Sequence, residues 1–511
     1  MDDTARRMGG TVSAGDPATV WDGAVLDSRK VAGGELFFAL PGERTDGHRF
    51  VGAAFEAGAA AAVVERDVPL DGLAGRGCLI RVADTYEGLH ALTRSLRSEA
   101  PETLVAVTGS AGKTTTKELL AAMCARRFRT ARNPGNLNNL FGFPVSFLSI
   151  PEGTEVMVAE LGMSVAGEMA AVSRLARPDG AVLTNVRPAH LENFPDVAAI
   201  AEAKAEVFQG LAGDGAGRPF VVANGTDPEV VRVTRRWQAE TGGRVVWFGL
   251  AEAALPEGPA LDVRARDLAA RSAEPGAQAG ATGSHPASAG ASEAPGPAAA
   301  GAPAVFGTRF VLELGDEALE AELPLHGGYN VENALAAAAA ARELGVGAED
   351  VRRALGVARP EGHRGAVHPL EGGGLLVDDA YNSNPDALAR ALRGAAELPG
   401  TAGGRRLAIL GDMLELGPGS PRFHREAGAR AARLGFTPVA GVGELARELV
   451  AGAREAGAEA EWLPDAGAAA DWAARRVRPG DLVLVKGSRG VGLERVAEEL
   501  LEARGAREEV P

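Results

Sequence analysis

The segment LVAVTGSAGKTTT, residues 104–116, places the tightest constraint on what this chain can fold into. A short run of apolar, partly β-branched residues leads into a glycine-containing loop, and the helix-forming sequence KELLAAMC follows. This order predicts a buried strand, a tight loop and a helix whose N-terminus faces the loop. Backbone N–H groups of such a loop, together with the helix N-terminus, bind phosphate groups.

The residue types in the loop predict how it would hold a nucleoside triphosphate. In this pattern Lys113 reaches the β- and γ-phosphates and the Thr114 hydroxyl binds Mg²⁺. The complete pattern has a glycine at the position of Val107. The alternative is a chance Gly-Lys-Thr in a chain with 68 glycines, but the flanking strand and helix favour the phosphate loop. The nucleotide-binding candidates in the loop are Gly109, Ser110, Ala111, Gly112, Lys113, Thr114 and Thr115.

Strand-like and helix-like segments alternate along most of the chain. The strand-like segments are short, continuous apolar runs, which are typical of parallel strands buried on both faces. The alternation of strands and helices predicts an α/β fold with right-handed crossovers. A length of 511 residues suffices for three to four domains. The predicted strands are 104–108, 156–161, 181–184, 220–223, 375–377, 407–410 and 482–485, and the predicted helices are 114–125, 198–211, 331–344 and 386–398.

Composition excludes several classes of protein. Lys and Arg number 53 against 68 Asp and Glu, and the net charge of −15 argues against a protein that coats nucleic acid or an anionic membrane. Two cysteines, Cys78 and Cys124, cannot form a disulfide framework and indicate a reducing compartment. The first twenty residues lack a signal-peptide core, and no run of eighteen apolar residues predicts a membrane span. We therefore expect a cytoplasmic protein.

One segment, residues 272–304, differs from the rest in composition. Of its 33 residues, 28 are Ala, Gly, Pro or Ser, and none is Val, Ile, Leu, Met or aromatic. Such a segment has no side chains with which to build a core, so we expect it to be disordered. It is either a linker between domains or an insertion in one domain, and loop entropy permits both.

Three further residues are candidate metal ligands. Glu160 ends a predicted strand, and His190 follows another, so both are expected at the sheet edge where ligands gather in α/β folds. Lys204 lies on a predicted helix after His190. Taken alone, Glu160 could equally be a solvated strand end, His190 a hydrogen-bonded loop residue and Lys204 a surface lysine.

Several motifs together resemble one enzyme family. They are TGSAGKTTT, NPGNLNNLFGFP (133–144), HLENF around His190, GGYNVENALAAAA (327–339), DDAYNSNPDAL (378–388), LGDMLELG (410–417) and VKGSR (485–489). In this order they resemble the ATP-dependent Mur ligases of peptidoglycan synthesis. Residues 27–51 look like the uridine-nucleotide domain of that family, and their substrate-binding candidates are Ser28, Arg29, Asp46 and His48. The set is most similar to the members that join D-alanyl-D-alanine to UDP-N-acetylmuramoyl-tripeptide.

The resemblance implies a reaction and a set of roles. The tripeptide carboxylate would attack the γ-phosphate of ATP, and the dipeptide amine would then displace phosphate from the resulting acyl phosphate. Thr114 and Glu160 would hold one Mg²⁺, and His190 with a carbamylated Lys204 would help to hold a second. The resemblance also places Asn330 and Asn333 at adenine, Arg364 and Asp379 at the phosphates and ribose, and Asn136, Asn138 and Asn139 at the substrate.

Adjacent positions at a strand end limit one of these choices. Asp378 and Asp379 face opposite ways, so only one can point at a ligand, and the family pattern selects Asp379. Turn formation alone would also explain asparagines in a Gly- and Asn-rich loop.

The resemblance implies three α/β domains and a set of partners. Residues 1–100 would bind the UDP-MurNAc-peptide, 101–358 would form the parallel-sheet ATPase domain with 272–304 as an insertion, and 359–511 would form a Rossmann-like domain. We expect a monomer that acts on small molecules, with no nucleic-acid partner. The rival interpretations are another Mur-type ligase, either tripeptide-forming or folylpolyglutamate-type, and a non-enzymatic nucleotide switch. The Asp-Asn-Pro-Arg box usual in tripeptide-forming relatives is absent from the sequence.

Overall fold

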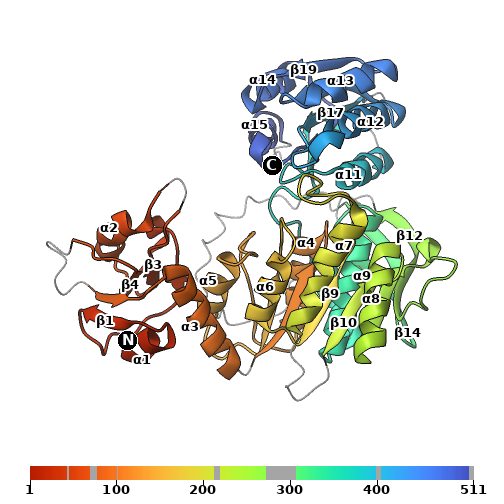
Figure 1. Cartoon of the computed structure of the whole chain (residues 1–511). Coiled ribbons are helices and arrows are strands. Elements are labelled where there is room, and N and C mark those ends of the chain that lie inside the picture. The colour runs from red at the N-terminus through yellow and green to blue at the C-terminus, as the bar shows by residue number, and fades with distance from the viewer. Residues whose placement is uncertain are drawn as a thin grey trace, which may run out of the picture.

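Three sheets follow one another along the chain, each accompanied by helices (Figure 1). The computed structural model describes residues 1–42, 45–69, 77–100, 102–211, 219–271, 306–398 and 404–505. We name the parts after their sheets: the first unit, the central unit and the last unit. In Figure 1 the last unit stacks on the central unit, and the first unit stands to the side. The α/β fold predicted from the alternation of elements is confirmed.

The first unit has a five-stranded sheet in the order β1-β5-β4-β3-β2. Strands β2 to β5 are parallel, and β1 pairs antiparallel with β5 at the edge. Its strands are β1 (Thr11–Ala14), β2 (Ala24–Val25), β3 (Leu36–Phe38), β4 (Ala61–Val64) and β5 (Cys78–Arg81). Its helices are α1 (Asp2–Arg7), α2 (Val51–Glu56) and α3 (Thr85–Glu99), with 3₁₀ turns η1 (Ser28–Lys30) and η2 (Gly47–Phe50).

The central unit has a nine-stranded sheet in the order β14-β13-β12-β11-β10-β9-β6-β8-β7. The strands from β7 to β12 in this order are parallel, and β13 and β14 add an antiparallel edge. They are β6 (Thr103–Thr108), β7 (Thr130–Arg132), β8 (Val156–Glu160), β9 (Gly180–Leu183), β10 (Phe220–Asn224), β11 (Arg244–Leu250), β12 (Val263–Arg271), β13 (Gly307–Leu314) and β14 (Glu317–Leu323).

Helices cover both faces of the central sheet, because successive residues of each parallel strand point to opposite sides. Leu104 and Ala106 of β6 pack into one core, and Val105 and Val107 pack into the other. Helices α6 (Glu168–Ala176), α7 (Val197–Ala205) and α8 (Pro228–Thr241) pack on the first face. Helices α4 (Lys113–Cys124), α9 (Gly328–Glu343) and α10 (Ala348–Gly356) pack on the second, and α5 (Gly142–Leu148) lies beside α3.

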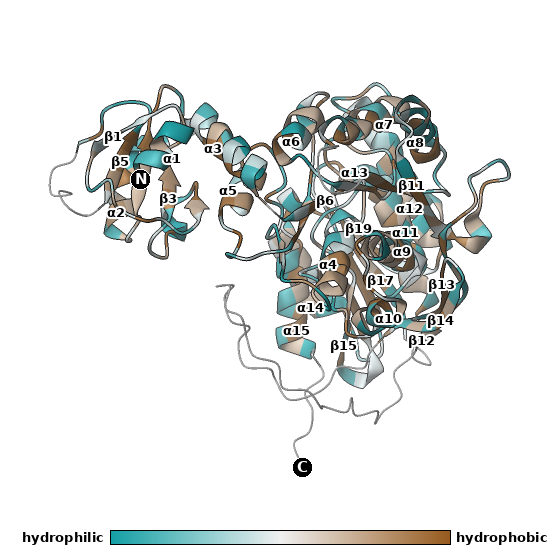
Figure 2. Cartoon of the chain, turned by 90° about the horizontal axis from the view of Figure 1, so that it is seen from below, coloured by the Kyte–Doolittle hydropathy of each residue, from teal (hydrophilic) through white to brown (hydrophobic). Residues whose placement is uncertain are grey.

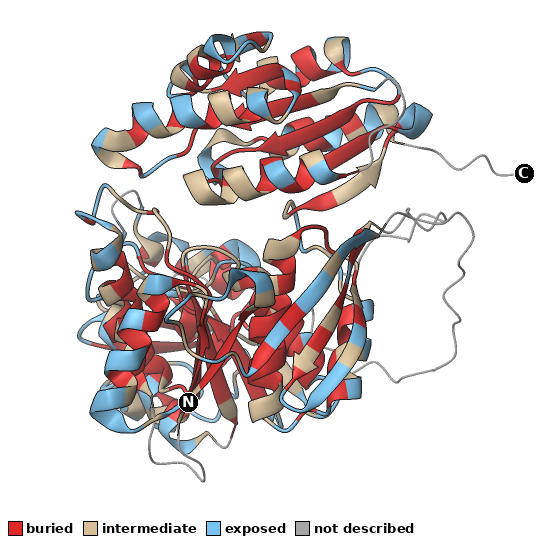
Figure 3. Cartoon of the chain, turned by 90° about the vertical axis from the view of Figure 1, so that its right-hand side faces the viewer, coloured by how far each residue is buried: buried red, intermediate tan, exposed pale blue. Residues whose placement is uncertain are grey.

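The last unit has a six-stranded sheet in the order β15-β16-β20-β17-β18-β19, in which only β15 runs antiparallel. Figure 3 shows its buried strands, like those of the central sheet, between layers of helices, and Figure 2 shows their hydrophobic colour. The strands are β15 (Ala366–Pro369), β16 (Leu375–Asp378), β17 (Arg406–Gly411), β18 (Phe436–Val442), β19 (Ala460–Leu463) and β20 (Leu482–Lys486). The helices are α11 (Pro385–Glu397), α12 (Ser420–Arg433), α13 (Ala446–Glu455), α14 (Ala466–Arg476) and α15 (Glu494–Arg504).

The predicted helix over residues 198–211 is shorter than expected. Helix α7 ends at Ala205, and a tighter 3₁₀ segment, Glu206–Gly210, follows it. The Glu206 carboxylate accepts hydrogen bonds from Gly167 N and Ala170 N at the start of α6. Gly210 lies against the Ser173 backbone of the same helix, so contacts with α6 impose the change of winding.

Residues 272–304 lie outside the described residues, but the strands on either side of them are paired. β12 runs antiparallel to β13, with Arg271 opposite Gly307. The segment therefore joins two neighbouring strands of one sheet. Separately, no helix in the described ranges is long and apolar enough to cross a membrane.

We predict that residues 272–304 can be replaced by a four-residue Gly-Ser linker without loss of thermal stability. The paired ends of β12 and β13 need only a short connection. Shortening the loop should stabilise the fold by roughly 2 kcal/mol through reduced closure entropy. Thermal denaturation followed by circular dichroism measures the effect, with a scrambled 272–304 segment of equal length as the control. A lower Tm in the shortened variant alone would contradict the prediction.

Candidate active site

The phosphate loop connects β6 to α4 and requires glycine at two positions. Gly109 has φ +147°, and a Cβ there would lie 2.0 Å from Thr184 Oγ1. Gly112 has φ +81°, and a Cβ there would lie 2.1 Å from Asn333 Oδ1. Both the backbone conformation and the close approach of neighbouring side chains therefore exclude other residues.

The segment after β9 holds the loop in place. Ser110 N donates to Asn185 O and Ala111 N to Asn185 Oδ1, both at 2.9 Å. Thr184 Oγ1 donates to Ala111 O at 2.8 Å. Because this segment continues β9, the strand next to β6, the order of strands in the sheet helps to fix the conformation of the loop.

A cavity of about 420 Å³ lies between the phosphate loop and the last unit. Its walls come from the carboxyl ends of central strands, the start of α9, and the ends of β16 and β20 with the start of α11. The sequence-predicted residues that line it are Ser110, Ala111, Gly112, Lys113, Thr114, Thr115, Asn136, Asn138, Asn139, Glu160, His190, Asn330, Asn333, Arg364 and Asp379.

Glu160 is a buried carboxylate at the end of β8, only 3% exposed. Thr114 Oγ1 donates to its Oε2 at 2.7 Å, and Asn138 Nδ2 donates to its Oε1 at 2.7 Å. Asn133 bonds the Glu160 backbone on both sides, through its amide oxygen and nitrogen. The carboxylate is thus fixed beside the hydroxyl at the start of α4.

Two lysines belong to this region: Lys113 interacts with the Glu160 carboxylate, and Lys204 interacts with Lys113. Lys113 Nζ donates to Gly109 O at 2.8 Å, and burial lowers the pKa of Lys113, with Glu160 acting in the opposite sense. Lys204 on α7 is only 2% exposed, and burial, followed by the charge of Lys113, holds its pKa well below the ordinary value. Lys204 does not line the cavity directly.

His190 lies in the loop after β9 with φ +55° and lines the cavity. Its Nδ1 is 2.5 Å from Glu415 Oε2, on a loop of the last unit. This contact lowers the pKa of Glu415. The Glu415 carboxylate lies against Nδ1, so Nε2 is the ring nitrogen that remains for a metal ion.

In the last unit, the two adjacent aspartates diverge as expected from their alternation. Asp379 lines the cavity, where Lys486 Nζ donates to its Oδ2 at 2.6 Å. Burial raises the pKa of Asp379, although Lys486 and Arg364 oppose this shift. Asp378 Oδ2 instead contacts His363 Nδ1 at 2.7 Å. The Arg364 guanidinium stacks over the Tyr381 ring, 3.6 Å from its centroid, and lines the same cavity.

The two asparagines of α9 lie on one face of the helix, close to the phosphate loop. Asn330 Nδ2 donates to His326 O at 2.9 Å, and Asn333 Nδ2 donates to Asn330 Oδ1 at 3.4 Å. Both are buried, and Asn333 Oδ1 is the atom that approaches Gly112.

The four candidates of the first unit lie away from this cavity. Ser28 begins η1, and Arg29 pairs with Asp27 at 2.7 Å. Asp46 Oδ1 accepts from His48 N and lies 2.7 Å from His48 Nδ1, while His48 Nε2 accepts from Glu65 N at 3.1 Å. These contacts fix the ring of His48, and burial lowers its pKa.

Several cavity residues were not predicted as site residues. Tyr381, Asn382 and Asn384 belong to the DDAYNSNPDAL motif, and Lys486 and Arg489 belong to VKGSR, so the motifs could have indicated them. Asn185 and Arg390 carried no motif signal. Only the pairing of strands and the packing of α11 bring them to the cavity.

The oxygen donors in the cavity suit a magnesium ion that is held largely by the phosphate oxygens of a bound nucleotide. No group of three or more His, Cys, Asp or Glu side chains in the described part of the chain could hold a metal ion by itself. A hydroxyl and a carboxylate 2.7 Å apart, Thr114 and Glu160, are hard oxygen donors next to a phosphate loop. Mg²⁺ is commonly bound by one or two carboxylates together with phosphate oxygens.

Three family descriptions match the chain. The Mur ligase middle domain matches residues 107–341, the Mur ligase glutamate ligase domain matches 363–489, and the Mur ligase family catalytic domain matches 22–125.

Individual proteins match over nearly the whole chain. The chain is 32% identical to UDP-N-acetylmuramoyl-tripeptide–D-alanyl-D-alanine ligase of Bacillus subtilis, over 95% of this chain and 94% of that protein. It is 31% identical to the protein of the same name from Escherichia coli, over 94% of each chain. Among solved structures, MurF from Acinetobacter baumannii aligns with a TM-score of 0.75 at 27% identity, covering 94% of this chain and 93% of that one. MurF of Thermotoga maritima in complex with ADP aligns with a TM-score of 0.71 at 27% identity, covering 95% of this chain and 99% of that one.

We predict that Gly112→Ala destabilises the protein more than Gly242→Ala does. Both glycines have positive φ, so each substitution incurs left-handed strain of about 1–2 kcal/mol. A Cβ at Gly242 meets nothing within 4 Å, whereas one at Gly112 displaces the Asn333 carboxamide. Urea denaturation compares the two midpoints. Equal losses of stability would mean that Asn333 does not constrain the loop.

Proposed function

This chain belongs to the Mur ligase family, and we propose that it is the ATP-dependent ligase that joins D-alanyl-D-alanine to UDP-N-acetylmuramoyl-tripeptide in peptidoglycan synthesis. The observation that carries the proposal is the cavity in which a phosphate loop, a buried carboxylate and the cations of the last unit meet. Similarity to ligases of that name over nearly the full length supports the choice of substrates.

The reaction forms one amide bond and cleaves one phosphoanhydride bond. The tripeptide carboxylate attacks the γ-phosphorus of ATP, which releases ADP and gives an acyl phosphate. The amine of D-alanyl-D-alanine then attacks the acyl carbon, loses a proton and expels inorganic phosphate. The products are UDP-MurNAc-pentapeptide, ADP and phosphate.

The first step brings an anionic carboxylate against an anionic triphosphate, and the site must compensate that repulsion. We assign to Lys113, at the start of α4, the neutralisation of charge on the transferred phosphoryl group, as in other phosphate-loop enzymes. Charges fixed before the reaction stabilise the transition state without reorganising. When bound, Mg²⁺ would supply further positive charge at the phosphate oxygens, held by Thr114 and Glu160.

We assign Lys204 and His190 to a second cation site. An ammonium at Lys204 would repel a divalent cation at 4 Å by on the order of 8 kcal/mol at an effective dielectric of 20. The lowered pKa of Lys204 favours the neutral amine, which is the form that reacts with CO₂. A carbamylated Lys204 would offer anionic oxygens of the kind that Mg²⁺ accepts.

The last unit and α9 would hold the nucleotide from the other side. Arg364 and Asp379 are assigned to the phosphates and ribose, and their positions in the cavity support this. Asn330 and Asn333 are assigned to adenine because asparagine can pair with its donor and acceptor. Lys486, hydrogen-bonded to Asp379, joins this group.

The remaining assignments concern the peptide substrate and the divisions of the chain. Asn136, Asn138 and Asn139 are assigned to the tripeptide substrate at the cavity, and Ser28, Arg29, Asp46 and His48 to its uridine nucleotide in the first unit. We set the domains at 1–100, 101–358 and 359–511. We further propose that the protein is a monomer and that it is cytoplasmic; the two free, buried cysteines support only the cytoplasmic location.

Phosphate release with each substrate omitted in turn tests the function. We predict release only when ATP, UDP-MurNAc-tripeptide and D-alanyl-D-alanine are all present.

In addition, Lys113→Ala should reduce ligation by at least about 10²-fold, because a preorganised charge is lost at the transferred phosphoryl group. Circular dichroism checks that the variant is folded. Release without the dipeptide would favour a nucleotide switch, and ligation within tenfold of the parent would remove Lys113 from the site.

We predict that Lys204→Ala loses most ligation and that added acetate or propionate restores part of it. A short carboxylate can occupy the space left by a carbamate and supply its anionic oxygens. The matched control is Lys113→Ala, which lacks a different group and should gain nothing from the same additives. Normal turnover of Lys204→Ala would show that the lysine has only a packing role.

A further inference from the structure

Helix α11 of the last unit contacts the central unit through three residues spaced four apart. Asp386 Oδ2 lies 3.4 Å from Arg187 Nε, and Arg390 Nη1 donates to Glu332 Oε2 at 2.6 Å. Gly394 O is 2.8 Å from His326 Nε2. Residues four apart lie on one face of a helix, so a single face of α11 docks on the central unit.

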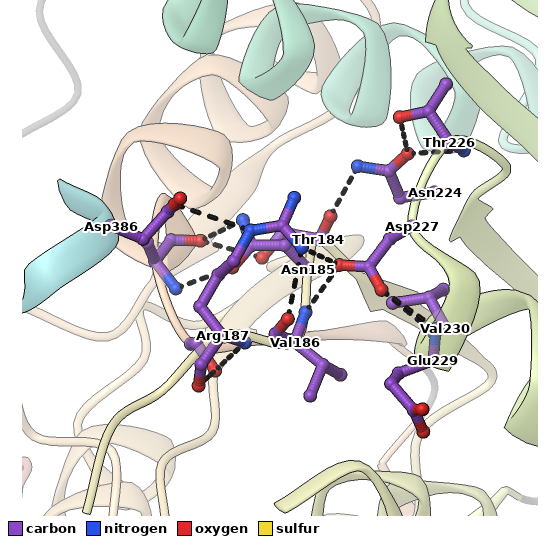
Figure 4. A network of polar contacts seen from close by, with 12 residues as sticks. Thr184, Asn185, Val186, Arg187, Asn224, Thr226, Asp227, Glu229, Val230 and Asp386 are labelled. Atoms are coloured by element: carbon purple, nitrogen blue, oxygen red, sulfur yellow. Dashed lines mark hydrogen bonds and ion pairs between the residues drawn. The ribbon is translucent and has the colours of Figure 1, made fainter. Parts of the chain in front are cut away.

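Arg187 holds its place in this interface by means of a buried anion (Figure 4). Its Nη1 donates to Asp227 Oδ2 at 2.6 Å, and Asp227 is only 1% exposed. The same carboxylate accepts hydrogen bonds from Val186 N and from Glu229 N and Val230 N at the start of α8. These hydrogen bonds hold the Asp227 carboxylate in one position. Asp227 in turn holds the Arg187 guanidinium, which points at Asp386.

The backbone of Arg187 is bonded to the phosphate loop. Arg187 N donates to Ser110 Oγ at 2.9 Å, and the same hydroxyl donates to Arg187 O at 3.1 Å. One residue therefore contacts the loop through its backbone and the last unit through its side chain.

The charges across the interface alternate in sign. Asp386 Oδ2 lies between Arg187 Nε and Arg390 Nε, the second at 2.8 Å. All the side chains of the series Asp227, Arg187, Asp386, Arg390 and Glu332 are at most 25% exposed. Such partly buried pairs are screened less than surface pairs, and losing one partner leaves the other uncompensated.

We propose that Arg187 is a positioning residue that couples the phosphate loop to the docking of helix α11. The proposal rests on the proposed function, because docking completes the nucleotide site. Asn384, Ala387 and Arg390 of the α11 region line the cavity opposite the loop. When the bound arrangement is only partly populated, the apparent affinity for a ligand falls by that fraction. Weakening the Arg187–Asp386 bridge should therefore weaken ATP binding more than it slows turnover.

A double-mutant cycle tests this coupling. Arg187→Ala and Asp386→Asn should each raise the KM for ATP roughly tenfold, with a much smaller change in kcat. The double variant should be no worse than the more affected single variant, because both remove one bridge. Asp386→Asn leaves the contacts of Asp227 intact, so it remains informative if Arg187→Ala folds poorly. Arg352→Ala, at an exposed ion pair with Glu349 on α10, is the control and should match the parent.

A distance measurement tests the docking without any catalysis. Spin labels at Ala239→Cys on α8 and Ala456→Cys after α13 occupy exposed positions, and the native Cys78 and Cys124 are buried. In the nucleotide-free protein, both bridge variants should broaden the interspin distance distribution relative to the parent and to Arg352→Ala. Parent-like distances and KM in both variants, or additive effects in the cycle, would overturn the proposal. If the parent proves not to be a ligase, the distances still decide whether the bridge holds α11.

Discussion

The site depends on the position of β6 between β8 and β9 in a parallel sheet. Register pairs Val107 with Glu160 on one side and Thr108 with Leu183 on the other. The phosphate loop, the Glu160 carboxylate and the segment from Thr184 to His190 must therefore leave the sheet at the same edge. The contacts that Thr184 and Asn185 make with the loop follow from this neighbourhood. The chemistry of the cavity is thus a consequence of strand order.

Burying the charged side chains of Glu160, Lys113 and Lys204 at this edge of the central sheet costs free energy. The structure reduces that cost in two ways. The Glu160 carboxylate accepts hydrogen bonds from two neutral donors, Thr114 and Asn138, which stabilise its charge. For the two lysines the cost is reduced differently. Burial lowers the pKa of both Lys113 and Lys204, which disfavours their protonated, positively charged forms. A polyphosphate with its cation would relieve both conditions at once, because it brings negative charge to the lysines and positive charge to the carboxylate.

The last unit meets the central unit through polar contacts, and Phe306 before β13 packs against its apolar core. His190 meets Glu415, Arg390 meets Glu332, and Arg187 meets Asp386 across the interface. Polar contacts of this kind are typical of interfaces between domains of one chain. The same contacts bring Asp379 and Lys486 opposite the phosphate loop.

The sequence by itself determined the α/β class, the strand–loop–helix unit that carries the phosphate loop, and several of the other strands and helices, because these follow from local residue order and periodicity. It also indicated family membership through ordered motifs. The tertiary structure alone decided that Asn185 and Arg390 line the cavity, that Arg187 contacts both the phosphate loop and α11, and that Lys204 is buried. It likewise decided that Glu206 ends α7 early by bonding to α6. The reason is physical: a side chain's neighbours across a sheet or an interface are set by strand order and docking, which no local pattern of residues encodes.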